Sequence, residues 1–265
     1  MKLADYFKKA KEEKFALGAF NIDSLEPLKG VAEAVKNMGT AVIVEVSPGE
    51  EKYLGLQNFV ALTVNLKEEF GINLFPNLDH ADDLEVIRDS IGLGFDMVHF
   101  DGSKLDLEEN IKLTKEVVAM AREKNVLVEG EMDQIGGKIT DPERAKKFVE
   151  RTGVDVLAVA IGNKHGFGEN EKLDLELLQK IHGILPETFL SLHGGSGIEA
   201  EDIRAAIGLG IVKININTEL RMVFRENLEN MLKGNPEEYA WYKLTLPAVE
   251  AVREVVEGKI RLFKS

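Results

Sequence analysis

The chain has 265 residues, of which 44% are hydrophobic, and it contains no cysteine. This length suits one α/β domain, residues 1–265, built around a large core. A formal net charge of -13 argues against a broad surface for nucleic acid or anionic lipid, so an anionic ligand must be held by a local site. Without cysteine, disulfide bonds and thiolate metal sites are excluded, and any metal must be bound by histidine or oxygen ligands.

The first 15 residues, MKLADYFKKAKEEKF, are typical of an amphipathic charged helix with Leu3, Phe7 and Ala10 on one side. They lack the apolar core of a secretory signal, and no apolar run in the sequence approaches the length of a membrane span. We therefore expect a cytoplasmic protein with neither a nucleic-acid partner nor a membrane partner.

Short apolar, β-branched runs alternate with helix-like stretches, which is the pattern of a parallel sheet built from βα units. The eight predicted strands are 16–22, 41–46, 73–79, 97–101, 126–132, 156–161, 188–193 and 211–217. Glycine or asparagine, which tolerate positive φ, precede six of these strands. The segment TDPE at 140–143 combines the spacing of a capping box at Thr140 with a proline at the start of a helix. Eight such units predict a closed (β/α)8 TIM barrel, and an open doubly wound sheet is the alternative.

Polar side chains gather at the C-terminal ends of the predicted strands, where barrel enzymes place their chemistry. The residues at these positions are Asn21, Ser47, Asp79, His80, Asp101, Glu131, His165, His193, Asn215 and Asn217. Because a barrel brings these strand ends to one mouth, we expect the side chains to meet in a common site, with Asn21 and Ser47 among the residues that bind substrate.

Three of the five histidines follow predicted strands, namely His80, His165 and His193. Three imidazoles with an open fourth position make a catalytic zinc site, so together they predict Zn2+ binding. For each histidine alone, an isolated polar residue in a loop is the alternative. His99 lies within the fourth predicted strand and His182 on a predicted outer helix, and both are expected to be structural.

Carboxylates surround this predicted metal site. Asp79 directly precedes His80, so it could handle a substrate proton beside the metal, or it could orient a metal ligand. Glu129 and Glu131 share one face of the fifth predicted strand, and such a pair inside a barrel requires a cation, a proton or an ion-pair network. Asp101, at the end of the fourth predicted strand, could likewise face a cation or belong to an ion-pair network.

Two loops favour phosphate binding. HGGSG at 193–197 follows the seventh predicted strand, and NINT at 215–218 follows the eighth. These loops often build the phosphate site of a barrel, because glycines let backbone N–H groups approach an anion at a helix N-terminus. A tight βα corner needs glycine as well. The predicted phosphate-binding residues here are Gly194, Gly195, Ser196, Asn215, Asn217 and Thr218.

With these residues assembled, the chain resembles the class II, zinc-dependent fructose-bisphosphate and tagatose-bisphosphate aldolase family over nearly its whole length. The segments that carry the resemblance are ALGAFNIDSLE, VSPGEEKYLG, NLDHADD, DGSKLDLEENIKLTK, VEGEMDQIGG, KKFVERTGVDVLAVAIGNKHG, LHGGSGI, VKININTEL and AVEAVREVVEGKI. Their order and spacing make the resemblance specific.

The resemblance implies that His80, His165 and His193 hold zinc and that Asp79 handles the hydroxyl proton at the carbon–carbon bond. It implies a second metal position at Asp101 and Glu131. The positions that match a dihydroxyacetone phosphate site are Gly166, Gly194, Ser196, Asn215 and Thr218. It also implies reversible cleavage of fructose 1,6-bisphosphate or tagatose 1,6-bisphosphate and a homodimer or homotetramer. A monovalent cation is an optional second cofactor.

The sequence departs from the family pattern after the glycine pair at 136–137. Relatives carry a longer acidic loop there, and it supplies the base that removes a carbon-bound proton. Here two residues, 138–139, lead directly to Thr140. A base must lie within hydrogen-bond reach of that proton, and Glu131 is the first replacement that we expect.

Further departures concern the aldehyde half of the substrate. Asn217 stands where bisphosphate aldolases often have aspartate, and the arginine that reaches the distal phosphate has no clear match near Lys243. Two alternatives therefore stand beside the bisphosphate aldolase. One is a zinc enzyme that acts on another sugar phosphate, and the other is a non-catalytic phosphosugar-binding barrel.

Overall fold

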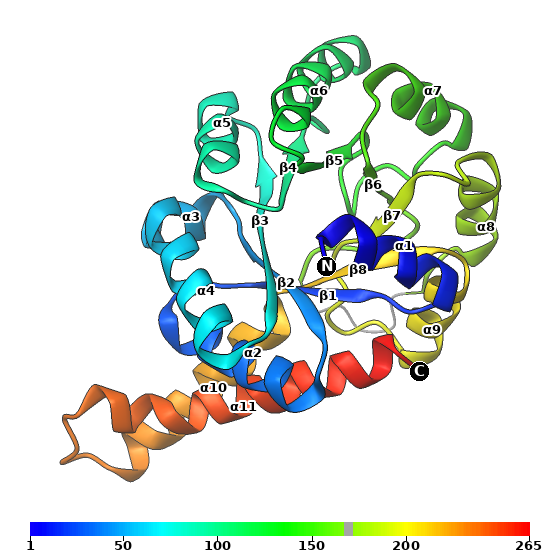
Figure 1. Ribbon diagram of the computed structural model, residues 1–265. Coiled ribbons are helices and arrows are strands. Elements are labelled where there is room, and N and C mark those ends of the chain that lie inside the picture. Colours follow the sequence, from blue (N-terminus) through cyan, green and yellow to red (C-terminus); the bar gives the residue numbers. More distant parts are fainter. Residues whose placement is uncertain (167–171) are drawn as a thin grey trace.

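Eight parallel strands form a closed barrel in the computed structural model, which describes residues 1–166 and 172–265 (Figure 1). Each strand pairs with the next, and β8 pairs with β1. The strands are β1 Leu17–Asn21, β2 Ala41–Val46, β3 Asn73–Ala81, β4 Met97–Asp101, β5 Leu127–Glu131, β6 Val156–Ala158, β7 Phe189–Leu192 and β8 Ile211–Ile216. The predicted (β/α)8 TIM barrel is confirmed, and the open sheet is excluded.

Helices surround the strands. They are α1 Leu3–Glu13, α2 Leu25–Met38, α3 Pro48–Leu54, α4 Leu56–Phe70, α5 Leu84–Leu93, α6 Leu107–Arg122, α7 Pro142–Thr152, α8 Leu175–Ile184, α9 Ala200–Gly208, α10 Thr218–Gly234 and α11 Trp241–Phe263. Within residues 1–166 and 172–265, no helix combines the length and the apolar character that crossing a membrane requires.

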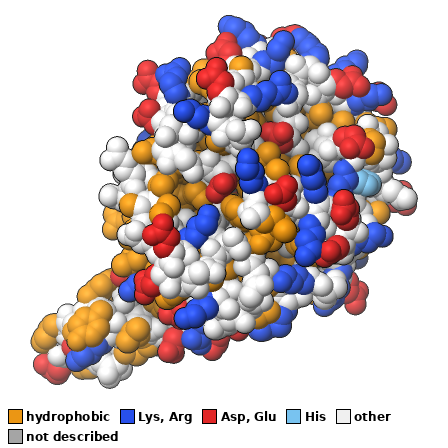
Figure 2. Space-filling view, in the orientation of Figure 1, with side chains coloured by type: hydrophobic (Ala, Val, Ile, Leu, Met, Phe, Trp, Pro, Cys, Tyr) orange, Lys and Arg blue, Asp and Glu red, His pale blue; other side chains and the backbone are white. Residues whose placement is uncertain are grey.

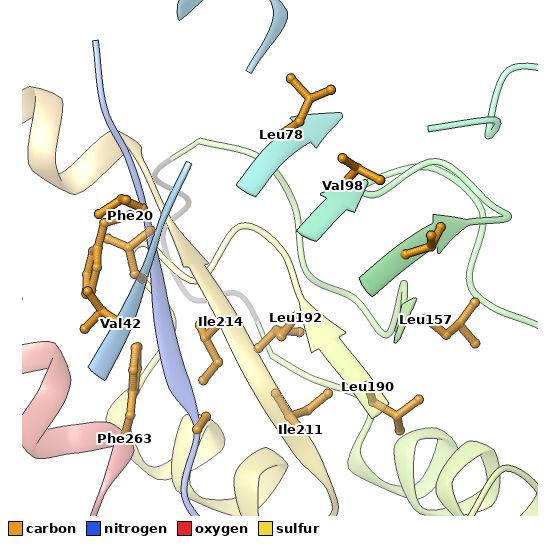
Figure 3. Close-up of a cluster of buried hydrophobic side chains, with 14 of the residues drawn as sticks. Phe20, Val42, Leu78, Val98, Leu157, Leu190, Leu192, Ile211, Ile214 and Phe263 are labelled. Atoms are coloured by element: carbon orange, nitrogen blue, oxygen red, sulfur yellow. The ribbon is translucent and has the colours of Figure 1, made fainter. Parts of the chain in front are cut away.

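Strand side chains alternate between two cores. Those that point outward pack against the helices, as Figure 3 shows for Phe20, Val42 and Leu157 together with Phe263 of α11. Those that point inward near the strand beginnings form a second cluster, which includes Phe75. The apolar face of α1, with Leu3, Phe7 and Ala10, belongs to this second cluster. Helix α1 therefore closes the N-terminal end of the barrel and leaves the C-terminal end as the mouth.

Strand β6 ends at Ala158, three residues earlier than predicted. The predicted cap of α7 at Thr140 is wrong. Asp141, not Thr140, caps α7, because its side chain accepts a hydrogen bond from Arg144 N. Thr140 is buried, and its hydroxyl accepts a hydrogen bond from Ala160 N at 2.9 Å. Thr140 N also donates to Ala160 O at 2.9 Å. The chain after Ala158 is therefore bonded to the β5–α7 loop, which ends β6 early.

The helix pair α10–α11 extends away from the barrel at the lower left of Figure 1. Helix α11 packs on α2 along the barrel wall and on α10 in the extension. Large exposed hydrophobic side chains lie on this pair and its connection, including Tyr239, Trp241 and Tyr242. Figure 2 shows hydrophobic side chains gathered at the outer end of this extension.

Candidate active site

The end of β3 places two consecutive polar side chains at the barrel mouth. His80 has a φ of 50°, a left-handed conformation that is uncommon for residues other than glycine. The pairing of β3 with β4 shifts register between Leu78 and Ala81. In a regular strand, neighbouring side chains point to opposite faces, and a bulge can re-aim one of them. The shift therefore lets both Asp79 and His80 line the mouth.

The three histidines predicted to bind metal meet at this mouth. The ring centroids lie 4.9 Å apart for His80 and His165, 4.6 Å apart for His80 and His193, and 6.2 Å apart for His165 and His193. His80 lies near the end of β3, His193 directly follows β7, and His165 lies further along the chain after β6. His193 is buried, whereas His165 is exposed.

Two of these rings are oriented as metal ligands are. His80 Nε2 and His193 Nδ1 lie 2.9 Å apart. On the far side of each ring, His80 Nδ1 lies 3.0 Å from Asp101 Oδ2, and His193 Nε2 lies 2.8 Å from Glu129 Oε1. A carboxylate that accepts the outer N–H of a histidine leaves the inner nitrogen free to bind a metal. The arrangement thus fits a transition-metal ion between the two rings.

Two overlapping groups of side chains could hold such an ion. One consists of Asp79, His80, His99 and His193, and the other of His80, Asp101 and Glu131, each with ligand atoms within 4.8 Å of one another. Nitrogen and carboxylate ligands without sulfur suit Zn2+ among other divalent transition metals. His165 lies at the edge of these groups, next to His80.

His99 was expected to be structural, and its ring lies directly against the rings of His80 and His193. It is fully buried, and its ring centroid lies 4.6 Å from that of His80 and 5.0 Å from that of His193. Its Nε2 has no hydrogen-bond partner among the residues that the structure describes, and it lies 3.5 Å from Glu131 Oε2. His99 and Asp101 are two apart on β4, so their shared face was a signal that the sequence already carried.

A buried lysine neutralises the carboxylates inside the barrel. Lys213 Nζ donates to Glu129 Oε2 at 2.8 Å and lies 3.6 Å from Glu45 Oε2. Ser191 Oγ also donates to Glu129. Burial alone would lower the pKa of Lys213, but the carboxylates of Glu129 and Glu45 hold that pKa above its ordinary value. Glu129 therefore belongs to an ion-pair network, one of the interpretations open from sequence, although Lys213 was not foreseen as its partner.

Glu131 and Asp101 lie beneath the mouth, against His80. Glu131 Oε1 accepts a hydrogen bond from Ile135 N at 3.2 Å, and Oε2 lies 3.5 Å from His80 Nδ1. Burial raises the pKa of Glu131 to about 7. Asp101 accepts hydrogen bonds from the backbone and hydroxyl of Ser103. Its pKa lies below its ordinary value, because the bond to His80 outweighs burial.

A cavity of about 360 Å³ opens at the mouth beside the histidines. Twelve of the site residues expected from sequence line it, and Arg221 joins them. The lining consists of Asn21, Ser47, Asp79, His80, His165, Gly166, His193, Gly194, Ser196, Asn215, Asn217, Thr218 and Arg221. The expected residues Glu131, Asp101 and Gly195 lie outside this lining.

The glycine-rich segment after β7 borders one side of the cavity. Gly194 has a φ of 66°, and a Cβ there would lie 1.8 Å from Lys164 O, so only glycine fits. Gly195 N donates to Asn215 O of β8 at 3.0 Å. This N–H therefore holds the loop in place. Helix α10 begins at Thr218, so its positive end faces the cavity and favours an anion there.

Asp79 is the carboxylate that reaches the cavity beside the histidines. Its Oδ1 accepts a hydrogen bond from Asn215 Nδ2 at 3.2 Å, and its Oδ2 accepts one from Asn21 Nδ2 at 3.2 Å. Burial opposes ionisation, but the neighbouring His80 and His99 hold the pKa of Asp79 well below its ordinary value. Asp79 is therefore an ionised carboxylate with two amide donors.

A histidine and carboxylate cluster that could hold a metal ion lies beside a helix N-terminus at the strand ends of a closed barrel, and this arrangement is that of a barrel enzyme. The whole chain, residues 1–265, matches the family described as fructose-bisphosphate aldolase class-II. The protein belongs to this family, which cleaves and forms carbon–carbon bonds by aldol chemistry.

Relatives agree with this membership. A protein of Staphylococcus aureus named fructose-bisphosphate aldolase is 36% identical over 268 residues, which cover 96% of this chain and 93% of the relative. The crystal structure of the YdjI aldolase from Escherichia coli K12 is 32% identical, with a TM-score of 0.88 over 100% of this chain and 97% of that one. Fructose-bisphosphate aldolase from Campylobacter jejuni shares the fold at 22% identity, with a TM-score of 0.88, 98% of this chain and 93% of that one being covered.

Proposed function

We propose that the protein is a zinc-dependent aldolase that reversibly cleaves a phosphorylated ketose to dihydroxyacetone phosphate and an aldehyde. The observation that carries the proposal is the pair of inward-facing nitrogens of His80 and His193, each ring held from behind by a carboxylate. A Zn2+ ion bound there would polarise the ketone and stabilise the negative charge that develops when the adjacent proton leaves.

The proposed zinc ligands are His80, His165 and His193, with Asp101 and Glu131 at a second metal position that shares His80. The overlap of the two ligand groups at His80 supports this second position. A monovalent cation is an optional second cofactor in this proposal.

The phosphate of dihydroxyacetone phosphate is proposed to lie against the glycine-rich segment and the start of α10. Gly194, Ser196 and Thr218 line the cavity on this side, together with Gly166. The helix N-terminus supplies partial positive charge in a chain whose net charge is -13. Asn215 is expected to contact the substrate beside this phosphate.

Asp79 is the proposed acid and base for the substrate hydroxyl. In cleavage, its ionised carboxylate takes the hydroxyl proton of the aldehyde-forming carbon while the carbon–carbon bond breaks. The electron pair of that bond stays on the dihydroxyacetone phosphate half, which is then protonated. In the reverse direction, Asp79 returns the proton to the new hydroxyl. The amides of Asn21 and Asn215 keep the carboxylate aimed into the cavity.

Glu131 is the proposed base for the carbon-bound proton, in place of the loop acids that relatives carry. It is the buried carboxylate behind His80, with one oxygen bonded to Ile135 N and the other free of hydrogen bonds among the described residues. To reach the substrate it must turn past the His80 ring. Asp101 and a metal-linked water are the fallback bases.

The assembly proposed is a cytoplasmic homodimer or homotetramer. Support comes from the exposed hydrophobic side chains of the α10–α11 extension, since a patch of this kind often marks a protein interface. Sedimentation of the purified protein measures its mass directly.

Turnover of a panel of ketose phosphates by the zinc-loaded protein tests the proposed function. Fructose 1,6-bisphosphate comes first in the panel because of the relatives' names, and tagatose 1,6-bisphosphate follows because of the family resemblance of the sequence. Release of dihydroxyacetone phosphate, lost after chelation and restored by zinc, is expected for at least one ketose. Binding without release from any ketose would favour the non-catalytic phosphosugar-binding barrel.

A further inference from the structure

Glu50 is a buried carboxylate behind the wall of the mouth cavity, and it lines an adjoining cavity that shares Asn21 and Arg221 with the mouth. The site described above makes no use of it. It lies in the first turn of α3 and is 4% exposed. Its Oε2 accepts hydrogen bonds from Ser47 N at 2.7 Å and from Asn21 Nδ2 at 3.0 Å. Its Oε1 accepts from Asn217 Nδ2 at 3.3 Å and from Arg221 Nη2. Four donors therefore converge on one carboxylate.

All four donor residues line the mouth cavity. Asn21 ends β1, Ser47 follows β2, Asn217 follows β8, and Arg221 lies in the first turn of α10. Arg221 carries the one cationic side chain among the cavity's lining residues within the described part of the chain, apart from the histidines. Because Glu50 binds Arg221, the pair contributes no net charge to this wall. The glycine-rich segment after β7, with Gly194 and Ser196, lies outside this set of donors.

The two sides of the mouth cavity suit different chemical groups. A phosphate needs donors or cations that are free to face it. On the Glu50 wall, those groups already donate to a carboxylate, so the wall offers no net positive charge, and a second phosphate would also meet the negative charge of Asp79 beside Asn21. Like charges brought together at a binding site disfavour binding. Hydroxyl groups can both donate and accept, so they can share the amides of Asn21 and Asn217.

We propose that Glu50 is a specificity-determining residue that excludes a second phosphate, so that the substrate is a ketose monophosphate whose other end carries uncharged hydroxyl groups. The inference rests on the proposed aldolase function and narrows it, because it makes the bisphosphates poor substrates. A second cavity of about 810 Å³ shares Asn21 and Arg221 with the mouth, and it gives room for an extended polyhydroxy chain.

Glu50 also has a local structural role that any test must separate from specificity. It closes a capping box with Ser47 at the start of α3. Glutamine fills this capping position as well as glutamate does. The variant Glu50→Gln therefore keeps the cap and the size of the side chain. It removes the charge and replaces one accepting oxygen by an amide N–H2 group, which leaves Asn217 and Arg221 without that acceptor. Glu51→Gln, one residue further along α3 and outside the lining of both cavities, is the matched control.

The experiment measures binding of two non-cleavable polyols, glucitol 1-phosphate and glucitol 1,6-bisphosphate, to the zinc-loaded protein by calorimetry. Wild-type protein and Glu51→Gln should bind the monophosphate more tightly than the bisphosphate. Glu50→Gln should shift the ratio of the two dissociation constants toward the bisphosphate by about tenfold or more, mainly by strengthening binding of the bisphosphate. Tighter binding of the bisphosphate by the wild type, or an unchanged ratio in a folded Glu50→Gln, would overturn the inference.

Because these polyols cannot be cleaved, the result does not depend on turnover. Should the protein cleave no ketose phosphate, the proposed aldolase function fails while the ratio still decides the role of Glu50. Should the protein cleave fructose 1,6-bisphosphate faster than fructose 1-phosphate, the aldolase function stands and the inference fails.

Discussion

Lys213 and Glu129 form an ion pair at the centre of the barrel, with Nζ 2.8 Å from Oε2 and both side chains fully buried. The other oxygen of Glu129 faces His193 Nε2 at 2.8 Å. The pair thus connects the interior of the barrel to a proposed metal ligand. Glu129 holds the His193 ring, and Lys213 keeps Glu129 charged.

The first prediction concerns this pair. Lys213→Met should lower the free energy of unfolding by about 3–5 kcal/mol, because it leaves Glu129 as a buried carboxylate without a cation. Urea unfolding at neutral pH measures the change. The double variant Lys213→Met with Glu129→Gln should recover part of the loss. A single variant within about 1 kcal/mol of wild type would show that the pair is dispensable for stability.

The second prediction concerns metal content. His193→Ala and His80→Ala should lose the zinc that wild-type protein binds, at about one ion per chain, and should remain folded because both residues lie at the mouth and not in the apolar cores. His182→Ala on α8 is the control and should keep its zinc. Elemental analysis of the purified variants gives the answer, and full zinc retention in both mouth variants would refute the metal assignment.

The third prediction concerns Asp79. Asp79→Asn should keep zinc and slow cleavage by at least ~10²-fold, because the amide preserves the shape of the side chain but cannot take the hydroxyl proton. Steady-state cleavage of a verified ketose phosphate measures this rate. Wild-type turnover in the zinc-loaded variant would reduce Asp79 to a supporting residue.

The fourth prediction concerns pH. Burial raises the pKa of Asp96 to about 6. The folded protein therefore keeps a proton that the unfolded chain has lost between about pH 4 and pH 6. The stability that Asp96 contributes is complete below this window and falls as the pH rises through it. Asp96→Asn should thus raise the free energy of unfolding at pH 7 by about 1 kcal/mol and leave it unchanged at pH 4.

Urea unfolding at the two pH values tests this difference. Asp89→Asn on the exposed face of α5 is the control and should change stability equally little at both. A gain for Asp96→Asn at pH 4 as large as that at pH 7 would contradict the assignment of the effect to burial of a charge.

Much of the barrel could be predicted from sequence because the strands are short apolar runs and six of the eight are preceded by glycine or asparagine, which tolerate positive φ. Gly39, Gly71, Gly94, Asn125 and Gly153 all have positive φ at these points. The early end of β6 could not be predicted, since it depends on hydrogen bonds between Ala160 and Thr140, 20 residues away in sequence.

The sequence predicted the candidate site residues at the barrel mouth, but not the buried residues beneath them. Residues that follow strands stand out as polar positions after apolar runs, which is how His80 and His193 were found. Lys213 lies inside β8, where the sequence alone does not show which carboxylates it faces. His99 lies inside β4, and its only signal was the spacing of two residues that places it on the same face as Asp101. The role of Glu50 depends on four donors from three separate segments, and only the folded chain brings these together.

The proposed aldol chemistry depends most directly on removal of the carbon-bound proton of dihydroxyacetone phosphate. The measurement is exchange of that proton with solvent deuterium, followed by NMR with zinc-loaded protein in heavy water. The account predicts exchange that requires zinc, is slower than in relatives with the acidic loop, and falls further in Glu131→Gln. Exchange that is unchanged in Glu131→Gln would move the base to another residue. Binding without exchange above the zinc-free control would contradict the aldolase function itself.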